Sequence, residues 1–260
     1  MAKGKAIIIL HPMELLALAL APIVFIFTFV YLKDEYEREP LKYLVITFIL
    51  GICTALPVLF IGEYLQILTG TSQASDSFGV FIYAFFVVAF TEEVMKFLVL
   101  RFYNYPHKEF DEPYDGIMYG VAVSLGFAAI ENVLYVFNSE GSEIQTGIVR
   151  MFTAVPAHAM FGIMMGYFMG RAKFIEEKNK KVLEMLKGLG VAIFFHGVYD
   201  YFLFLGEGFL AIFAFASLAV GLFLATRAMR IHVEESPHKD APSMLDDFDL
   251  PAGEKEADEG

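Results

Sequence analysis

The chain has 260 residues, of which 57% are hydrophobic and 19% are charged. Soluble domains have about 45–50% apolar and about 25% charged residues. Several runs of about 20 apolar residues therefore indicate a multi-pass membrane protein. The net charge of −12 is uneven, because residues 231–260 contain ten acidic residues and two lysines. Nothing is basic enough to indicate a nucleic-acid partner, and the single cysteine excludes an internal disulfide.

We predict an all-α polytopic membrane protein with about seven transmembrane helices. They cover about residues 12–32, 42–68, 78–100, 114–137, 148–170, 186–205 and 208–229. The first span resembles a signal peptide, but its apolar stretch is longer than a signal h-region. Because no clear break follows the alanine-rich residues Ala17 to Ala21, we retain it as a span.

The distribution of lysine and arginine predicts the orientation of these helices. Thirteen of them lie in the first, third and fifth loops and after the last span, against three on the other side. This places the N-terminus outside and the C-terminus in the cytoplasm of a multi-pass protein of the cell membrane. Residues 1–230 then form one transmembrane domain. Residues 231–260 form an acidic cytoplasmic tail with too little apolar surface to fold alone, which predicts disorder.

The third span contains Glu92, Glu93 and Lys96 inside an apolar run. Each ionisable side chain near the bilayer centre costs roughly 2.5–3.5 kcal/mol, so such residues usually mark a functional site. Glu92 and Lys96 are four residues apart and share a helical face. Glu93 points about 100° away, so we expect Lys96 to neutralise only one of the two carboxylates. A purely structural ion pair is the alternative.

Small residues recur every four positions in the fourth span, at Gly116, Gly120, Ser124 and Ala128. Such a face allows a neighbouring helix to approach closely. Asn132 continues the line and Glu131 lies beside it, so both should face protein. A structural role in hydrogen bonding between helices and a catalytic role explain Asn132 and Glu131 equally well.

The next two spans repeat this pattern, with His158, Gly162, Gly166 and Gly170 in one and Gly188, Ala192, His196 and Asp200 in the other. Pro156 is expected to kink the fifth span beside His158. Asp200 lies one turn from His196 and can orient its ring. A packing role is the alternative for each histidine.

Taken together, the ionisable side chains of spans three to six would cost on the order of 20 kcal/mol if they were unpaired. They must therefore converge or line a hydrated cavity. A carboxylate and imidazoles around such a cavity can activate water and stabilise an oxyanion, as peptide hydrolysis requires. Glu92 is the candidate general base. The zincin motif HExxH is absent, although zinc held by His158, His196 and Glu92 remains possible.

These residues resemble the PrsW-type intramembrane proteases, related to the CAAX prenyl endopeptidases of the CPBP/Abi superfamily. The likeness covers about residues 85–205. It rests on Glu92-Glu93-x-x-Lys96, Asp115-Gly116, Phe127-x-x-x-Glu131-Asn132, His158 and His196-x-x-x-Asp200. The resemblance implies an endopeptidase that cleaves membrane-anchored proteins, with single-span anti-sigma factors as the known substrate type.

The resemblance also implies roles for individual residues. Glu92 corresponds to the water-activating glutamate, His158 assists it, and His196 polarises the scissile carbonyl. Asp200 stands where the CAAX relatives have asparagine, so orienting His196 is its expected role. The catalytic prediction is Glu92, Glu93, His158 and His196, and the supporting prediction is Lys96, Glu131, Asn132 and Asp200.

A glutamic mechanism without a cofactor is favoured over a zinc-dependent one. Two other functions remain open at this point. A proton- or ion-coupled transporter would use the same groups as a relay, but the spans show no inverted repeat. A non-catalytic membrane scaffold would retain the polar residues without turnover.

Overall fold

The computed structural model describes residues 11–73 and 76–239, and these residues form helices and connections without a strand. Seven helical segments are long and apolar enough to cross a membrane, as predicted. They are Pro12–Leu32 (α1), Leu41–Thr69 (α2), Ser77–Asn104, Pro113–Phe137 (α5), Glu143–Lys173, Lys178–Phe204 (α8) and Ala211–Glu234 (α9). A short 3₁₀ turn, Thr71–Gln73, follows α2.

The third span is not a uniform α-helix. It consists of α3 (Ser77–Ile82), a π-helical stretch (Tyr83–Ala89), α4 (Phe90–Val99) and a second π-helical stretch (Leu100–Asn104). π-Helical turns are rare and occur often at functional sites. Here they flank the short helix α4, whose first turn carries both glutamates of the third span.

The fifth span is divided into α6 (Glu143–Phe152) and α7 (Ala154–Lys173) at Thr153, which has φ −126° and ψ −76°. We expected a kink beside Pro156, and the helix breaks three residues before it. Proline has no N–H to donate to the carbonyl four residues earlier, and its ring clashes with that carbonyl. The break therefore falls within the turn that Pro156 disrupts.

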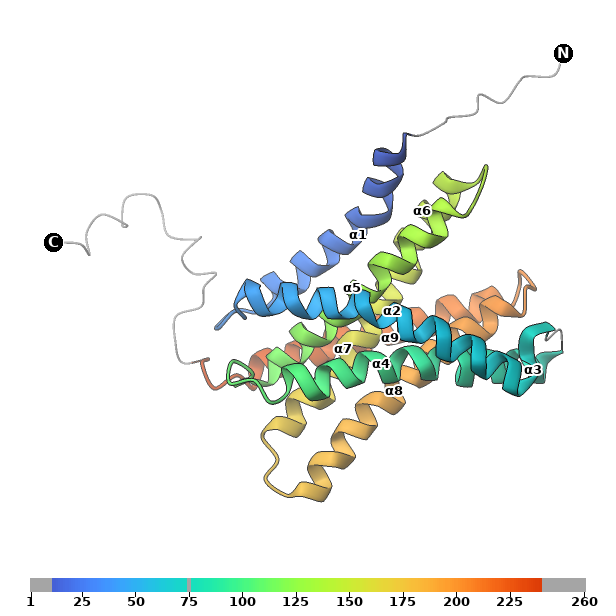
Figure 1. Cartoon of the computed structure of the whole chain (residues 1–260). Helices are drawn as coiled ribbons and strands as arrows, with labels where there is room; N and C mark the ends of the chain where they lie inside the picture. Colours follow the sequence, from blue (N-terminus) through green and yellow to red (C-terminus); the bar gives the residue numbers. More distant parts are fainter. Residues whose placement is uncertain (1–10, 74–75, 240–260) are drawn as a thin grey trace, which may run out of the picture.

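Helix α5 lies at the centre of the bundle and is buried along most of its length (Figure 1). It crosses α7 where the glycine stripes predicted in the fourth and fifth spans meet. A Cβ atom at Gly116 or Gly120 would overlap the backbone of Gly166 or Gly162. The expected close approach is confirmed, and it holds the polar residues of α5 and α7 at one level.

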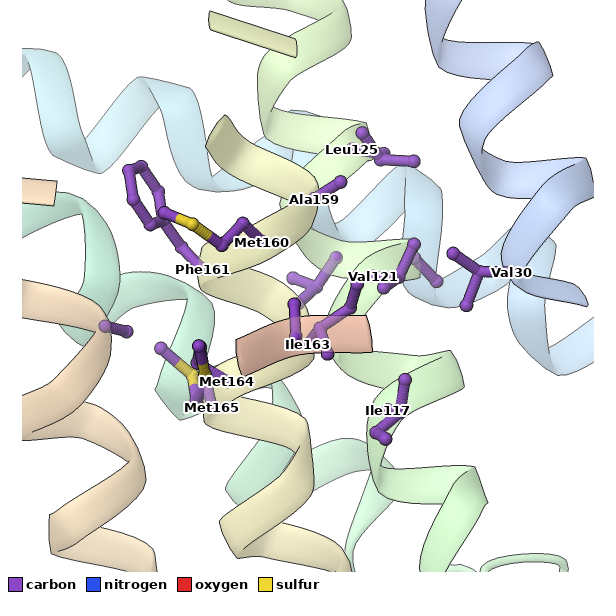
Figure 2. Close-up of a cluster of buried hydrophobic side chains, with 14 of the residues drawn as sticks. Val30, Ile117, Val121, Leu125, Ala159, Met160, Phe161, Ile163, Met164 and Met165 are labelled. Carbon is purple, nitrogen blue, oxygen red and sulfur yellow. The ribbon is translucent and has the colours of Figure 1, made fainter. Parts of the chain in front are cut away.

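Apolar side chains fill the space around this crossing (Figure 2). Ile117 and Val121 of α5 are fully buried, as is Met160 of α7. In contrast, large apolar side chains on α2, such as Phe60 and Ile67, are about two-thirds exposed, at 66% and 68%. An apolar exterior around a packed interior is the pattern of a helix bundle that faces lipid.

Helix α9 continues to Glu234, and the structure describes the chain as far as Lys239. The segment predicted as a disordered tail thus begins within α9. Residues 240–260, the greater part of that segment, lie outside the described residues.

Candidate active site

The ammonium of Lys96 lies at the centre of the charged cluster on α4. Its Nζ atom lies 3.2 Å from Glu92 Oε2 and 2.8 Å from Glu93 Oε1. It also lies 3.3 Å from His158 Nδ1 and 4.3 Å from the centre of the Phe127 ring. Our expectation that Lys96 would neutralise only one carboxylate was wrong. Residues three and four positions earlier on a helix are both within reach of a lysine side chain.

Contacts at both ring nitrogens and on one ring face hold the His196 side chain of α8 in place. Its Nδ1 atom lies 2.9 Å from Glu93 Oε1, and its Nε2 atom lies 3.2 Å from Asp200 Oδ2. Nε2 is also 4.0 Å from Glu92 Oε2. The ring stacks on Phe161 of α7, with centres 4.6 Å apart and an interplanar angle of 13°. Both ring nitrogens thus face carboxylate oxygens, so each can carry an N–H donor.

His158, on α7, joins this group to the polar residues of α5. Its Nε2 atom lies 2.8 Å from Glu131 Oε2, the same oxygen that lies 2.9 Å from Arg150 Nη2. Arg150 Nε donates to Asn132 Oδ1 at 2.6 Å, and Asn132 Nδ2 donates to Ala19 O at 2.7 Å. The eight residues predicted for the site therefore belong to one connected network.

A cavity of about 650 Å³ opens beside this network between α2, the third span, α5, α6, α7 and α8. Its polar wall consists of Glu92, Glu131, Arg150, His158, His196 and Asp200, and its other walls are largely apolar. Glu93, Lys96 and Asn132 do not line it and are at most 1% exposed. The cavity residues are therefore the ones placed to meet a substrate, and these three support them from behind.

Arg150 is a site residue that sequence reasoning missed. It counted only as a loop charge, yet it binds Glu131 and Asn132 together. The sequence did contain a hint of this role. Glu131 lies in a membrane span and needs a cation, and Arg150 is the nearest to it in sequence of the three cations assigned to the outer side of the membrane. Phe161 and the ring of Phe127 were also missed as contacts, since aromatic residues are too frequent in the spans to stand out.

The arrangement allows a test of whether the site fits a metal ion. Ligand atoms of Glu92, Glu93 and His196 lie within 4.8 Å of one another. The zinc ligand set that the sequence left possible was different, since it included His158, which instead faces Glu131 and Lys96.

The position of Lys96 argues against a metal ion bound by Glu92, Glu93 and His196. Its ammonium bonds to the same two oxygens, Glu92 Oε2 and Glu93 Oε1, that an ion at this position would use. Glu93 Oε2 is buried without a hydrogen-bond partner among the described residues, but one free oxygen does not make a site. The residues therefore do not fit a divalent ion unless Lys96 moves.

Comparisons with known proteins identify the family of this chain. Residues 39–226 match the family model described as "PrsW family intramembrane metalloprotease". The chain is 39% identical to Protease PrsW of Geobacillus kaustophilus over 196 residues, 75% of this chain and 81% of the relative. It is 35% identical to Protease PrsW of Bacillus subtilis over 189 residues, 73% of this chain and 82% of the relative. No solved structure matches the chain. The family model matches most of the chain and these relatives match it over most of their own length, and the chain therefore belongs to the PrsW family of intramembrane proteases.

Proposed function

We propose that this membrane protease hydrolyses peptide bonds with a water molecule activated by Glu92. The observation that carries the proposal is the position of the Glu92 carboxylate. It lines the cavity, while Lys96 holds its Oε2 atom from behind and His196 Nε2 lies 4.0 Å from the same oxygen. A general base must reach the proton that it removes, and the cavity gives Glu92 access to water and substrate.

In the proposed reaction, Glu92 takes a proton from water as the water oxygen attacks the scissile carbonyl carbon. The negative charge that develops on the carbonyl oxygen is stabilised by the Nε2–H of His196, which this oxygen shares with Asp200, while Glu93 and Phe161 hold the ring in place. The C–N bond then breaks as the proton held by Glu92 passes to the leaving nitrogen, and His158, oriented by Glu131, assists this transfer. Arg150 acts through Glu131 and is a positioning residue.

The mechanism that we favour is of the glutamic type and uses no cofactor. The support is the position of Lys96, whose ammonium already compensates the two glutamates on which a metal would depend. The description of the family as metalloproteases makes this a point to test. Activity that survives chelators, in protein without stoichiometric zinc, is the expected result.

The proposed substrate is a single-span membrane protein of the anti-sigma-factor type. A cavity of about 650 Å³ with one polar wall suits an extended peptide segment that enters from lipid. We also propose that the protein is related to the CAAX prenyl endopeptidases. We further propose that it lies in the cell membrane, with the N-terminus outside and the C-terminus in the cytoplasm.

The test compares membrane proteomes of cells that express the wild-type chain or Glu92→Gln at equal levels. The amide keeps the shape of the side chain and loses the base. We expect single-span protein fragments only with the wild type. With a fragment identified, the purified variant should lose at least about 10²-fold in kcat. Glu63→Gln, which changes a cavity carboxylate of α2 outside the polar network, is the matched control.

Two outcomes would contradict the proposal. A purified Glu92→Gln enzyme that cleaves at the wild-type rate would exclude Glu92 as the base. Identical fragment patterns from the two cell populations would favour the scaffold or the transporter, and ion-flux measurements would then separate those two.

A further inference from the structure

Three segments that are far apart in sequence meet at one end of the bundle, which we call the loop face. They are the α1–α2 connection (33–40), the loop before α5 (105–112) and residues 235–239 after α9 (Figure 1). His238 Nε2 lies 2.7 Å from Glu37 Oε2. Ser236 is buried, and its hydroxyl donates to a carboxylate oxygen of Glu112. The segment after α9 is thus held against both loops.

One side chain from each segment offers a metal ligand at this face. Glu37, Asp111 and His238 each supply one ligand atom, and these atoms lie within 4.8 Å of one another. Glu37 and Asp111 are exposed and His238 is half-buried, so ions in water can reach the group. One imidazole nitrogen with two carboxylate oxygens is a ligand set that suits Zn²⁺, with water in the remaining position.

Two buried carboxyl groups belong to the same two loops. Asp34 and Glu112 are each 1% exposed, and their carboxyl groups face one another. Asp34 Oδ2 has no hydrogen-bond partner within residues 11–73 and 76–239. Glu112 in turn accepts the hydrogen bond from Ser236, which anchors the segment that carries His238. The ligand group itself contains two exposed carboxylates, Glu37 and Asp111, and a cation bound there would offset their charge.

We propose that Glu37, Asp111 and His238 bind one Zn²⁺ ion, which fastens the segment after α9 to the two loops. The group lies in connections outside the membrane spans and shares no residue with the cavity wall. Glu37 and His238 fall outside residues 39–226, which the family model matches. The site is therefore independent of the proposed protease chemistry, and its test needs no substrate.

The test measures Zn²⁺ binding to the full-length protein in detergent after removal of metals, by competition with a fluorescent chelator. We expect one equivalent to bind at the loop face and to raise the apparent Tm. His238→Gln and Asp111→Asn should each weaken this binding at least about tenfold, because each removes a ligand. Both should also abolish the zinc-dependent rise in Tm.

Two control variants separate this site from others. His107→Gln changes a second histidine of the loop face that is outside the group, and it should bind zinc as the wild type does. His196→Gln removes the imidazole of the intramembrane group and should leave the loop-face equivalent intact. The proposal is overturned if wild-type protein binds no zinc, or if His238→Gln binds it with unchanged affinity. Loss of zinc only in His196→Gln would overturn it as well.

Discussion

Buried carboxylates occur in two regions of this molecule, and the surroundings compensate them differently. The intramembrane cluster contains four carboxylates and four groups that can balance their charge. The carboxylates belong to Glu92, Glu93, Glu131 and Asp200. The balancing groups are a lysine, an arginine and two histidines, Lys96, Arg150, His158 and His196. At the loop face, three carboxyl groups are at most 3% exposed, and none of them forms a side-chain ion pair within the described residues: Asp34, Glu39 and Glu112.

The difference shows two ways of burying an acid. A carboxylate in a low-dielectric interior needs an opposite charge or a proton. The intramembrane cluster supplies opposite charges, which keeps polar groups oriented around the cavity. The loop face retains protons instead. Burial, together with the neighbouring carboxyl of Glu112, raises the pKa of Asp34 to about 9. Burial also raises the pKa of Glu39 to about 7, although Tyr119 donates a hydrogen bond to it.

The largest expected effect comes from removing the central cation of the intramembrane cluster. Lys96→Met leaves Glu92 and Glu93 buried without their ammonium. Breaking a buried ion pair in this way costs about 3–5 kcal/mol, so we expect a large drop in the apparent Tm in detergent. Adding Glu93→Gln to this variant should restore part of the loss.

The matched control for Lys96→Met is Lys180→Met. It breaks an exposed pair with Glu177, in which Nζ and Oε2 are 2.7 Å apart, and should cost at most about 1 kcal/mol. If the two variants melt at the same temperature, charge compensation does not hold the intramembrane cluster together.

A smaller effect is expected from Arg150→Gln, which acts on the reaction through Glu131 and His158. The variant should lower kcat about tenfold, part of what a well-placed acid–base group contributes, with little change in KM. Arg150→Lys keeps the charge but loses the two-pronged contact with Glu131 and Asn132, so it should recover part of the rate. A pH–rate profile for Arg150→Gln that overlays the wild type would contradict a positioning role.

The smallest expected effect tests whether the buried carboxyl group of Asp34 at the loop face is protonated in the folded protein. The pKa of Asp34 is about 9 in the folded protein against 3.8 as its ordinary value. Between these values the folded state binds more protons than the unfolded state, so the free energy of unfolding falls as pH rises. Asp34→Asn should remove part of that slope and raise the apparent Tm at pH 8 by about 2–4 °C.

Glu35→Gln, in the same connection, is the control for Asp34→Asn and should keep the wild-type dependence of Tm on pH. An Asp34→Asn variant whose Tm falls with pH as steeply as that of the wild type would show that Asp34 is ionised in the folded protein. The contrast between the two regions would then be lost.

Much of the fold could be predicted because it depends on local patterns. The lengths of apolar runs gave seven spans, and glycine every four residues gave the crossing of α5 and α7. A kink beside Pro156 was predicted, but the exact position of the break at Thr153 and the π-helical stretches around α4 were not. They depend on how neighbouring helices pack, and no short sequence pattern specifies that packing.

The residues of the site could be predicted better than their pairing. A charge in a membrane span needs a partner, so Glu92, Lys96 and His158 stood out in the sequence. Which groups meet depends on the rotation of each helix about its axis, and spacing along one helix does not contain that angle. For this reason Lys96 was expected to neutralise only one glutamate, and the zinc ligand set that the sequence left possible contained His158 in place of Glu93.

The hydrogen bond from Asn132 to Ala19 connects the first helix to the polar network beside the cavity. Ala19 lies in the alanine-rich stretch of the first span, and the family model begins only at residue 39. A protein shortened to the matched residues would lose the carbonyl that orients Asn132, and with it one support of Arg150. A cut within α1 would therefore disturb the polar network, although α1 carries none of its charged groups.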